Sequence, residues 1–285
     1  MNNMALREAI GEIPNPLGLE GLEFVEYSTT KPQALGQLLE TMGFRPIARH
    51  RSREVLLYRQ GEMNIVVDAH RATSETPSIS AFALRVRDAG AAYRRALERG
   101  AWPVPVDVQP MELHIPAIHG VGHSRIYFVD RWREFSIWNV DFVPVPTVDP
   151  QPPAVSGLHW FGLVQYIGLD RSDDWTEFYA ELFGWRVLPD AQRFGILPLG
   201  RLLRSPDGLM LQLVEPDIDA AERADDESLQ RLGFGVPDVP AAVTALRARG
   251  VQFVETERLH PESRGALTLP QLGGVTFELV RDARP

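Results

Sequence analysis

An internal repeat with a constant offset of 150 residues constrains the fold of this chain more than any other feature. The run at 83–100 starts with an apolar stretch, passes through Asp88 and an Ala-rich segment, and ends in Arg-Gly. The run at 234–250 has the same layout, with Asp238 at the matching place. Each run predicts a short strand, a capping Asp, a helix and a Gly that ends the helix. Because four elements agree in order and spacing, we interpret the two halves of the chain as copies of one architecture.

A second repeat pairs the beginnings of the two halves. Residues 38–44 and 179–185 each contain the end of a predicted helix, a Gly and an aromatic residue that opens a strand. Short runs of alternating, β-prone residues follow the helices. These runs predict strands at 55–58, 64–67, 125–129, 135–139, 209–214, 266–269 and 275–280.

The repeating units begin near Leu22, Ile79, Leu158 and Leu229. Each unit reads as a strand, a helix and then several strands. We therefore predict an α+β fold of four βαβββ modules that form two open-barrel halves, with the helices outside. The concave face of such a sheet is where a small ligand would bind.

Prolines mark the middle of the chain. Five of them fall between positions 144 and 153, which excludes a helix or a central strand and favours an extended spacer. We therefore expect an N-terminal pair of modules at 15–142, a Pro-rich linker at 143–156, and a C-terminal pair with the candidate site at 157–282.

Composition limits the function. The net charge of -9 argues against a nucleic-acid partner. No apolar run is long enough to span a membrane, and the N-terminal residues do not have the pattern of a signal peptide. The absence of cysteine excludes disulfides, thiolate nucleophiles and Cys-ligated metal sites. We expect a cytoplasmic protein with a small-molecule substrate. A homo-oligomer is compatible with the sequence, because sheets of this type often pair across their edges.

The N-terminal half resembles bacterial 4-hydroxyphenylpyruvate dioxygenases. The resemblance rests on residues 15–27, 42–44, 50–53, 57–61, 111–118 and 127–131. The C-terminal half is similar more loosely, at 178–183, 205–208 and 275–278. The resemblance implies the vicinal oxygen chelate fold of the glyoxalase/bleomycin resistance/dihydroxybiphenyl dioxygenase type. It also implies a C-terminal helix over the active site, which this sequence, ending at Pro285, does not contain.

The resemblance further implies a metal site in the C-terminal half. Two His and one Glu of the family hold Fe2+ and leave open positions for a 2-keto acid and dioxygen. The first His and the Glu correspond to His159 and Glu278, but the second His corresponds to Arg231. The internal repeat makes Gln212 the equivalent of Glu278. The four predicted inward positions are therefore His159, Gln212, Arg231 and Glu278.

Arg231 conflicts with a metal at this place. A guanidinium offers no lone pair and stays protonated, and it would repel a dication about 4 Å away by roughly 8 kcal/mol at an effective dielectric near 20. Either Arg231 turns away from the centre, or no metal binds and Arg231 forms a bidentate ion pair with Glu278. On sequence alone, His159 could also be an ordinary core histidine, and Glu278 could point outward on an edge strand.

Three functions remain open. The first is a dioxygenase-like enzyme for a small oxygenated acid, such as an aromatic 2-keto acid. In it, His159 and Glu278 hold a divalent metal, Gln212 assists and Arg231 orients the substrate. The second is a metal-free small-molecule-binding protein or pseudoenzyme, in which an Arg231–Glu278 pair replaces the metal. The third is a glyoxalase-type lyase or isomerase with Glu278 as general base.

A second group of histidines is His114, His119 and His123. Their spacing could serve a metal if a loop wrapped around it. The segment also contains Pro and Gly residues and lies in the half that is not catalytic in the family, so we interpret these side chains as solvated loop histidines.

Overall fold

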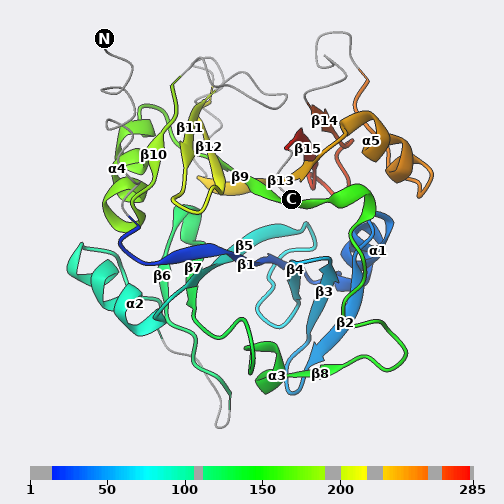
Figure 1. Ribbon diagram of the computed structural model, residues 1–285, viewed down its shortest axis with the longest axis horizontal. Coiled ribbons are helices and arrows are strands. Elements are labelled where there is room, and N and C mark those ends of the chain that lie inside the picture. The colour runs from blue at the N-terminus through cyan, green and yellow to red at the C-terminus, as the bar shows by residue number, and fades with distance from the viewer. Residues whose placement is uncertain (1–14, 106–111, 190–199, 217–226, 256–264, 283–285) are drawn as a thin grey trace, which may run out of the picture.

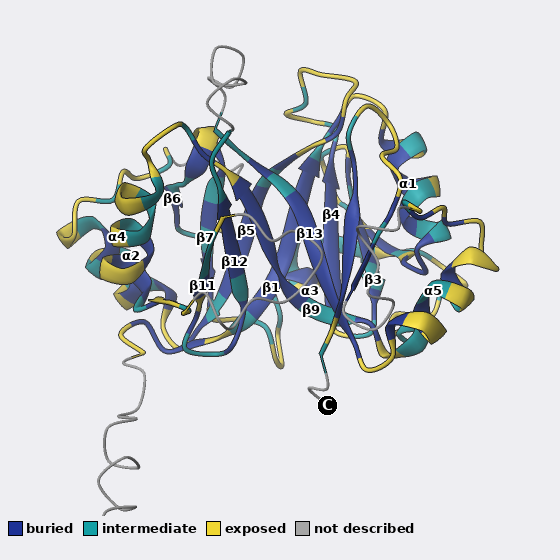
Figure 2. Cartoon of the chain, turned by 90° about the horizontal axis from the view of Figure 1, so that it is seen from above, coloured by how far each residue is buried: buried dark blue, intermediate teal, exposed yellow. Residues whose placement is uncertain are grey.

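The computed structural model describes residues 15–105, 112–189, 200–216, 227–255 and 265–282. The strands form one mixed sheet that curves through both halves of the molecule (Figure 1). The longer helices lie at its two ends: α2 and α4 at one, α1 and α5 at the other (Figure 2). No helix among these residues is long and apolar enough to cross a membrane.

Two modules and a short extension build the N-terminal half. The first module consists of β1 (Leu19–Ser28), α1 (Pro32–Thr41), β2 (Arg45–His50), β3 (Val55–Gln60) and β4 (Met63–Asp68). The second consists of β5 (Ser78–Val86), α2 (Ala89–Glu98), β6 (Ala117–His119), the 3-10 turn η1 (Val121–His123) and β7 (Arg125–Val129). A short helix α3 (Trp138–Asp141) and strand β8 (Phe142–Pro144) follow. Strands β1 and β5 pair antiparallel at the centre, and β4 and β7 flank them in parallel.

The C-terminal half repeats this arrangement after the 3-10 turn η2 (Val155–Gly157). The third module consists of β9 (His159–Tyr166), α4 (Ser172–Phe183), β10 (Arg186–Val187), β11 (Arg201–Arg204) and β12 (Met210–Val214). The fourth consists of β13 (Ser228–Val236), α5 (Val239–Arg247), β14 (Gly265–Leu267) and β15 (Phe277–Arg281). Strands β9 and β13 pair antiparallel, with β12 and β15 parallel beside them. The predicted α+β fold with two open halves is confirmed.

The offset of 150 residues persists in structural detail. Asp88 caps α2 by accepting a hydrogen bond from the backbone N–H of Ala91 at 2.7 Å, and Asp238 caps α5 in the same way through Ala241 at 2.9 Å. The isolated strand bridges that follow these helices keep the same offset: Pro103 with Ile118, and Phe253 with Thr268. The internal repeat is therefore a repeat of structure.

The two halves contact each other along the sheet and through their helices. Leu229 of β13 pairs with Ile79 of β5, which joins the two halves into one sheet. At one end of the molecule, the Arg249 guanidinium after α5 donates to the Thr41 carbonyl at the end of α1, at 3.0 Å. Buried apolar residues of both halves form one large core, in which the rings of Phe44 and Phe234 lie 6.0 Å apart.

The strand predicted at 135–139 is wrong. Strand β7 ends at Val129, residues 132–135 form bends and turns in which Phe135 has a φ of +56°, and helix α3 begins at Trp138. The helical turn points the Trp138 indole inward, where its N–H donates to Oε1 of Glu23 at 2.7 Å. This contact spans 115 residues of sequence, so a local pattern could not reveal it.

The predicted Pro-rich linker follows the surface of the N-terminal half. Its first residues belong to β8, which pairs with β2. Further along, the Pro150 carbonyl accepts a hydrogen bond from Arg59 at 3.0 Å, and the Val155 N–H donates to the Gln60 side chain at 2.8 Å. The domain boundaries themselves stay a prediction.

Candidate functional site

Strand pairing places the four predicted site residues on one face of the C-terminal sheet. Gln212 and Arg231 both pair with Val164, from opposite sides. Glu278 pairs with Gly233 and His159 with Gly235, on the same strand as Arg231. Residues 231, 233 and 235 alternate with their neighbours and share a face of β13. The sequence prediction of the inward face therefore agrees with the register of the strands.

Arg231 and Glu278 form an ion pair at the centre of this face. Nε of Arg231 lies 3.5 Å from Oε2 of Glu278, and the two side chains are 5% and 6% exposed. Nε and Nη2 of Arg231 have no hydrogen-bond partner among the described residues, so the bidentate geometry that we expected is wrong. Glu278 is opposite Gly233, two positions along β13 from Arg231, and Nε of the guanidinium approaches the carboxylate without a hydrogen bond.

His159 lies apart from this pair, at the beginning of β9. Its Nε2 is 3.2 Å from Oδ2 of Asp282, and its Nδ1 is 3.0 Å from the Gly157 carbonyl oxygen. The ring lies over Gly235, where a Cβ atom would be 2.2 Å from Nε2. Both ring nitrogens of His159 therefore have partners within the protein.

The space beside Gln212 and Glu278 is small. The hollow that they line together with Gly162, Val164 and Gly233 has a volume of about 20 Å³. One water molecule needs roughly 10–15 Å³ by this measure. The hollow therefore holds about one water molecule and no organic acid.

The N-terminal half has an equivalent face. Glu26 of β1 pairs with Ala81 of β5, as Val164 of β9 pairs with Arg231 of β13. Ala81 precedes Arg231 by the repeat offset of 150. A small alanine thus occupies the position at which the C-terminal half carries its guanidinium.

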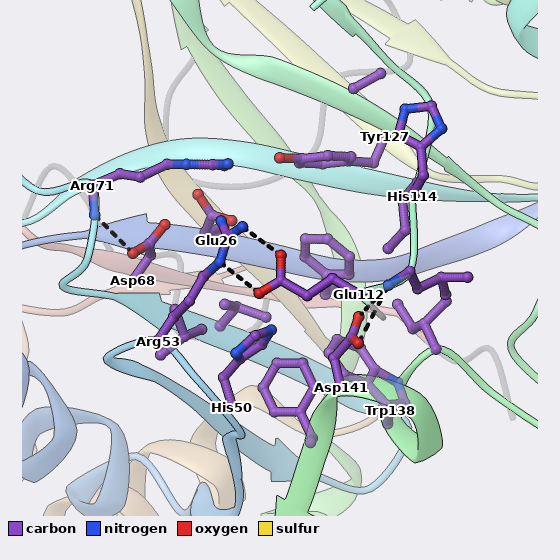
Figure 3. A pocket seen from close by; sticks show the side chains of 18 of the residues that line it. Glu26, His50, Arg53, Asp68, Arg71, Glu112, His114, Tyr127, Trp138 and Asp141 are labelled. Carbon is purple, nitrogen blue, oxygen red and sulfur yellow. Dashed lines mark hydrogen bonds and ion pairs between the residues drawn. The ribbon is translucent and has the colours of Figure 1, made fainter. Parts of the chain in front are cut away.

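The equivalent of Glu278 in the N-terminal half is Tyr127. Tyr127 pairs with Ala83, as Glu278 pairs with Gly233. A cavity of about 170 Å³ opens on this face, and Figure 3 shows its lining. The concave faces of the two halves therefore correspond in register and differ in free volume.

Aromatic residues form much of the cavity wall. The Phe24 ring lies 5.8 Å from that of Tyr127 and 5.5 Å from that of Trp138, which is itself 5.3 Å from that of Phe142. Helix α3 supplies one side of the cavity: besides the Trp138 indole, its Asp141 carboxylate accepts the Leu113 N–H at 3.1 Å. The extension after the second module thus closes the concave face of this half.

Charged side chains gather at the other side of the cavity. The Glu26 carboxylate accepts hydrogen bonds from Arg125 at 2.5 Å and from Ser80 at 2.6 Å. Burial nevertheless raises the pKa of Glu26, because desolvation outweighs these contacts. Arg53 holds Glu112 through two contacts, at 3.0 and 2.5 Å.

The three histidines that we interpreted as loop residues lie in two different places. Exposed His114 lines the aromatic cavity, whereas His119 and His123 line a separate hollow of about 620 Å³ that includes Ser228 and Gly274. The described residues contain no group of three or more His, Asp or Glu that could hold a metal ion.

Comparison with known proteins identifies the family. Residues 13–143 match the family Hydroxyphenylpyruvate dioxygenase, HPPD, N-terminal, and residues 159–279 match the Glyoxalase/Bleomycin resistance protein/Dioxygenase superfamily. The 4-hydroxyphenylpyruvate dioxygenase of a Pseudomonas sp. is 34% identical over 260 residues, which cover 84% of this chain and 72% of that protein. The chain belongs to the 4-hydroxyphenylpyruvate dioxygenase family.

Other proteins that are similar to this chain carry other names. Hemolysin VllY of Vibrio vulnificus is 34% identical over 85% of this chain and 74% of its own length. The 3-dehydroshikimate dehydratase of Pseudomonas aeruginosa is 34% identical over 85% of this chain but only 41% of its own length. Among solved structures, a mutant 4-hydroxymandelate synthase from Streptomyces coelicolor matches with a TM-score of 0.73 at 18% identity, over 95% of both chains. This last similarity shows the shared fold.

The residues present do not fit the metal that the 4-hydroxyphenylpyruvate dioxygenase resemblance implies. Coordination through Glu278 would bring a dication next to Arg231, which repels it and offers no lone pair. Coordination through Nε2 of His159 would displace the Asp282 carboxylate. Metal binding would therefore require both residues to leave their present partners, and their roles as metal ligands stay predictions.

Sequence reasoning missed the N-terminal cavity. One signal was present: Glu26 stands in the apolar run Phe24-Val25-Glu26-Tyr27, where a charge must find a partner. That partner, Arg125, is 99 residues away, so only the assembled sheet shows that the two side chains meet.

Proposed function

We propose that this chain is a metal-free, small-molecule-binding member of the 4-hydroxyphenylpyruvate dioxygenase family. The observation that carries the proposal is the buried ion pair between Arg231 and Glu278. It occupies the position at which the family resemblance expects the second His and the Glu of an iron site. The guanidinium supplies the positive charge that a metal would supply, and it leaves Glu278 compensated without one.

The experiment is a gain of metal binding. Purified wild-type protein and Arg231→His are incubated anaerobically with Fe2+, desalted, and measured for iron by elemental analysis. We expect wild type to retain far less than one iron per chain. Arg231→His removes the repelling charge and adds an imidazole, so it should retain more iron.

Arg231→Gln is the matched control, because it removes the charge without adding an imidazole. Iron in the His variant but not in the Gln variant supports the proposal. Stoichiometric iron in wild type that is lost in Glu278→Gln contradicts it.

The second candidate is a dioxygenase that acts on a small oxygenated acid, such as an aromatic 2-keto acid, through a partly altered metal site. It is favoured by the 34% identity to a 4-hydroxyphenylpyruvate dioxygenase over 84% of the chain. Oxygen uptake with 4-hydroxyphenylpyruvate and Fe2+ distinguishes the two functions. Sustained uptake that depends on Glu278 favours the dioxygenase.

A glyoxalase-type lyase or isomerase receives less support from the geometry. That reaction would use Glu278 as a general base. Oε2 of Glu278 already lies 3.5 Å from Nε of the Arg231 guanidinium. The hollow of about 20 Å³ beside Glu278 also leaves little room for a substrate.

A further inference from the structure

The two halves of the chain use their equivalent concave faces differently. In the C-terminal half, the buried Arg231–Glu278 pair stands on this face and the hollow beside Glu278 has a volume of about 20 Å³. In the N-terminal half, Ala81 and Tyr127 occupy the equivalent positions and a cavity of about 170 Å³ is present. Of these two equivalent faces, the one with space for a ligand therefore lies in the half that the family resemblance does not make catalytic.

The cavity has the size and lining for a single aromatic ring. A cavity of about 150 Å³ is known to hold benzene. Phe24 packs against both Tyr127 and Trp138, and these rings form a continuous aromatic wall against which a further aromatic group can pack. Val66 and Ile137 complete an apolar wall. An aliphatic acid without a ring would leave this wall uncovered.

The carboxylates around the cavity are already stabilised by the protein. Glu26 accepts from Arg125 and Ser80, and Glu112 accepts from Arg53. Asp68 accepts the backbone N–H groups of residues 70 and 71 at 2.8 and 3.1 Å, and Asp141 accepts that of residue 113. Arg125 and Arg53 offset the charges of Glu26 and Glu112, and the backbone N–H groups stabilise Asp68 and Asp141.

Two guanidinium groups reach the polar side of the cavity. Arg53 lies just before β3 and is nearly buried, with 12% of its side chain exposed. Arg71 is exposed at the mouth and extends toward Tyr127 and Glu26 (Figure 3). A guanidinium presents five N–H donors in a plane that matches a carboxylate.

We propose that the N-terminal cavity, formed by Phe24, Tyr127 and Trp138 with Arg53 and Arg71, binds a small aromatic carboxylate. The ring packs against the aromatic side chains, and the carboxylate points to the mouth, where Arg71 binds it. This inference rests on the proposed small-molecule-binding function, and it does not depend on the absence of metal from the C-terminal half.

Calorimetric titration of the full chain with three probes tests the ligand class. The probes are 4-hydroxybenzoate, the neutral 4-hydroxybenzamide and acetate. We expect saturable binding of 4-hydroxybenzoate, binding of the amide that is weaker by about tenfold or more, and none of acetate, because a charge-assisted hydrogen bond is worth about 1.5–3 kcal/mol. Equal affinity for the acid and the amide would show that Arg71 does not bind the ligand carboxylate, and would contradict the proposal.

Nuclear magnetic resonance locates the site. The chain has six tryptophans, and the Trp138 indole N–H, assigned through Trp138→Phe, should shift most on addition of 4-hydroxybenzoate. Arg71→Gln should weaken binding by about tenfold or more. Ala117→Phe, which projects a ring into the cavity from β6, should abolish it. The control is Arg99→Gln, at the exposed C-terminal end of α2. It should bind 4-hydroxybenzoate as wild type does.

The outcomes separate this inference from the proposed function. If 4-hydroxybenzoate binds equally to wild type, Arg71→Gln and folded Ala117→Phe, the site is elsewhere and the inference is wrong, while the chain still binds a small molecule. If none of the probes binds wild type, the inference is also wrong. Stoichiometric iron bound through Glu278 would instead refute the metal-free function and leave the cavity assignment standing.

Discussion

The Arg231 guanidinium and the Glu278 carboxylate lie 3.5 Å apart with almost no exposure to solvent. Burying two charges costs several kcal/mol per ion, and their attraction offsets this cost only while both are present. The pair therefore makes each residue depend on the other, and it defines how the C-terminal half departs from a metal site.

Removal of one partner of this pair should be costly. Arg231→Met leaves the Glu278 charge buried without its cation and should lower the free energy of unfolding by about 3–5 kcal/mol. The double variant Arg231→Met/Glu278→Leu removes both charges and should lose much less. Urea unfolding of the wild type, both single variants and the double variant gives the coupling energy. Additive effects would show that the two side chains do not interact.

Gly235 and Gly233 on β13 provide a test and a matched control for the position of the His159 ring. A Cβ on Gly235 would lie 2.2 Å from Nε2 of His159, whereas the nearest atom to a Cβ on Gly233 is 3.5 Å away. Gly235→Ala should therefore displace the His159 ring from Asp282 and lower stability by about 1–3 kcal/mol. Gly233→Ala should be close to neutral in urea unfolding. An equal loss in both variants would argue against the observed position of His159.

The repeated helix caps, Asp88 and Asp238, should contribute equally to the stability of the protein. Asp88→Ala and Asp238→Ala each remove a side-chain acceptor at the beginning of a helix. Each should lower the free energy of unfolding by about 1 kcal/mol. Asp→Asn at the same positions keeps an acceptor and should cost less. Chemical denaturation of the four variants checks this, and Ala variants as stable as wild type would contradict it.

His50, beside the cavity, predicts a pH dependence of stability. Burial lowers the pKa of His50 from its usual value of 6.5, against the opposite effect of Asp141 and Glu112. The unfolded chain then binds more protons at this group than the folded chain, so stability is lost as pH falls below about 6.5. His50→Asn should lose less stability than wild type between neutral and mildly acidic pH. The control is His70→Asn, at an exposed histidine. It should lose as much stability as wild type over the same pH range.

The sequence predicted the architecture because its signals are local and repeated. Strand β5 begins at Ser78 and β13 at Ser228, 150 residues later, since the same capping Asp and Ala-rich helix follow each strand. The family resemblance and the internal repeat selected Arg231 and Glu278 as inward positions, and this is why a contact between them was predicted from sequence.

The remaining features depend on contacts between distant segments. The side chains at 135–139 suit a strand or a helical turn equally, and the Trp138–Glu23 hydrogen bond decides between them. The separation of 3.5 Å between Arg231 and Glu278 depends on the register of β13 with β15. The N-terminal cavity needs Phe24, Arg53 and Trp138 together, and these residues come from three separate elements or loops.

The most direct test of the central claim is an anaerobic calorimetric titration of the wild-type chain with Fe2+. The buried Arg231–Glu278 pair predicts no saturable binding at one site per chain. Saturable one-to-one binding that disappears in Glu278→Gln would contradict the metal-free assignment.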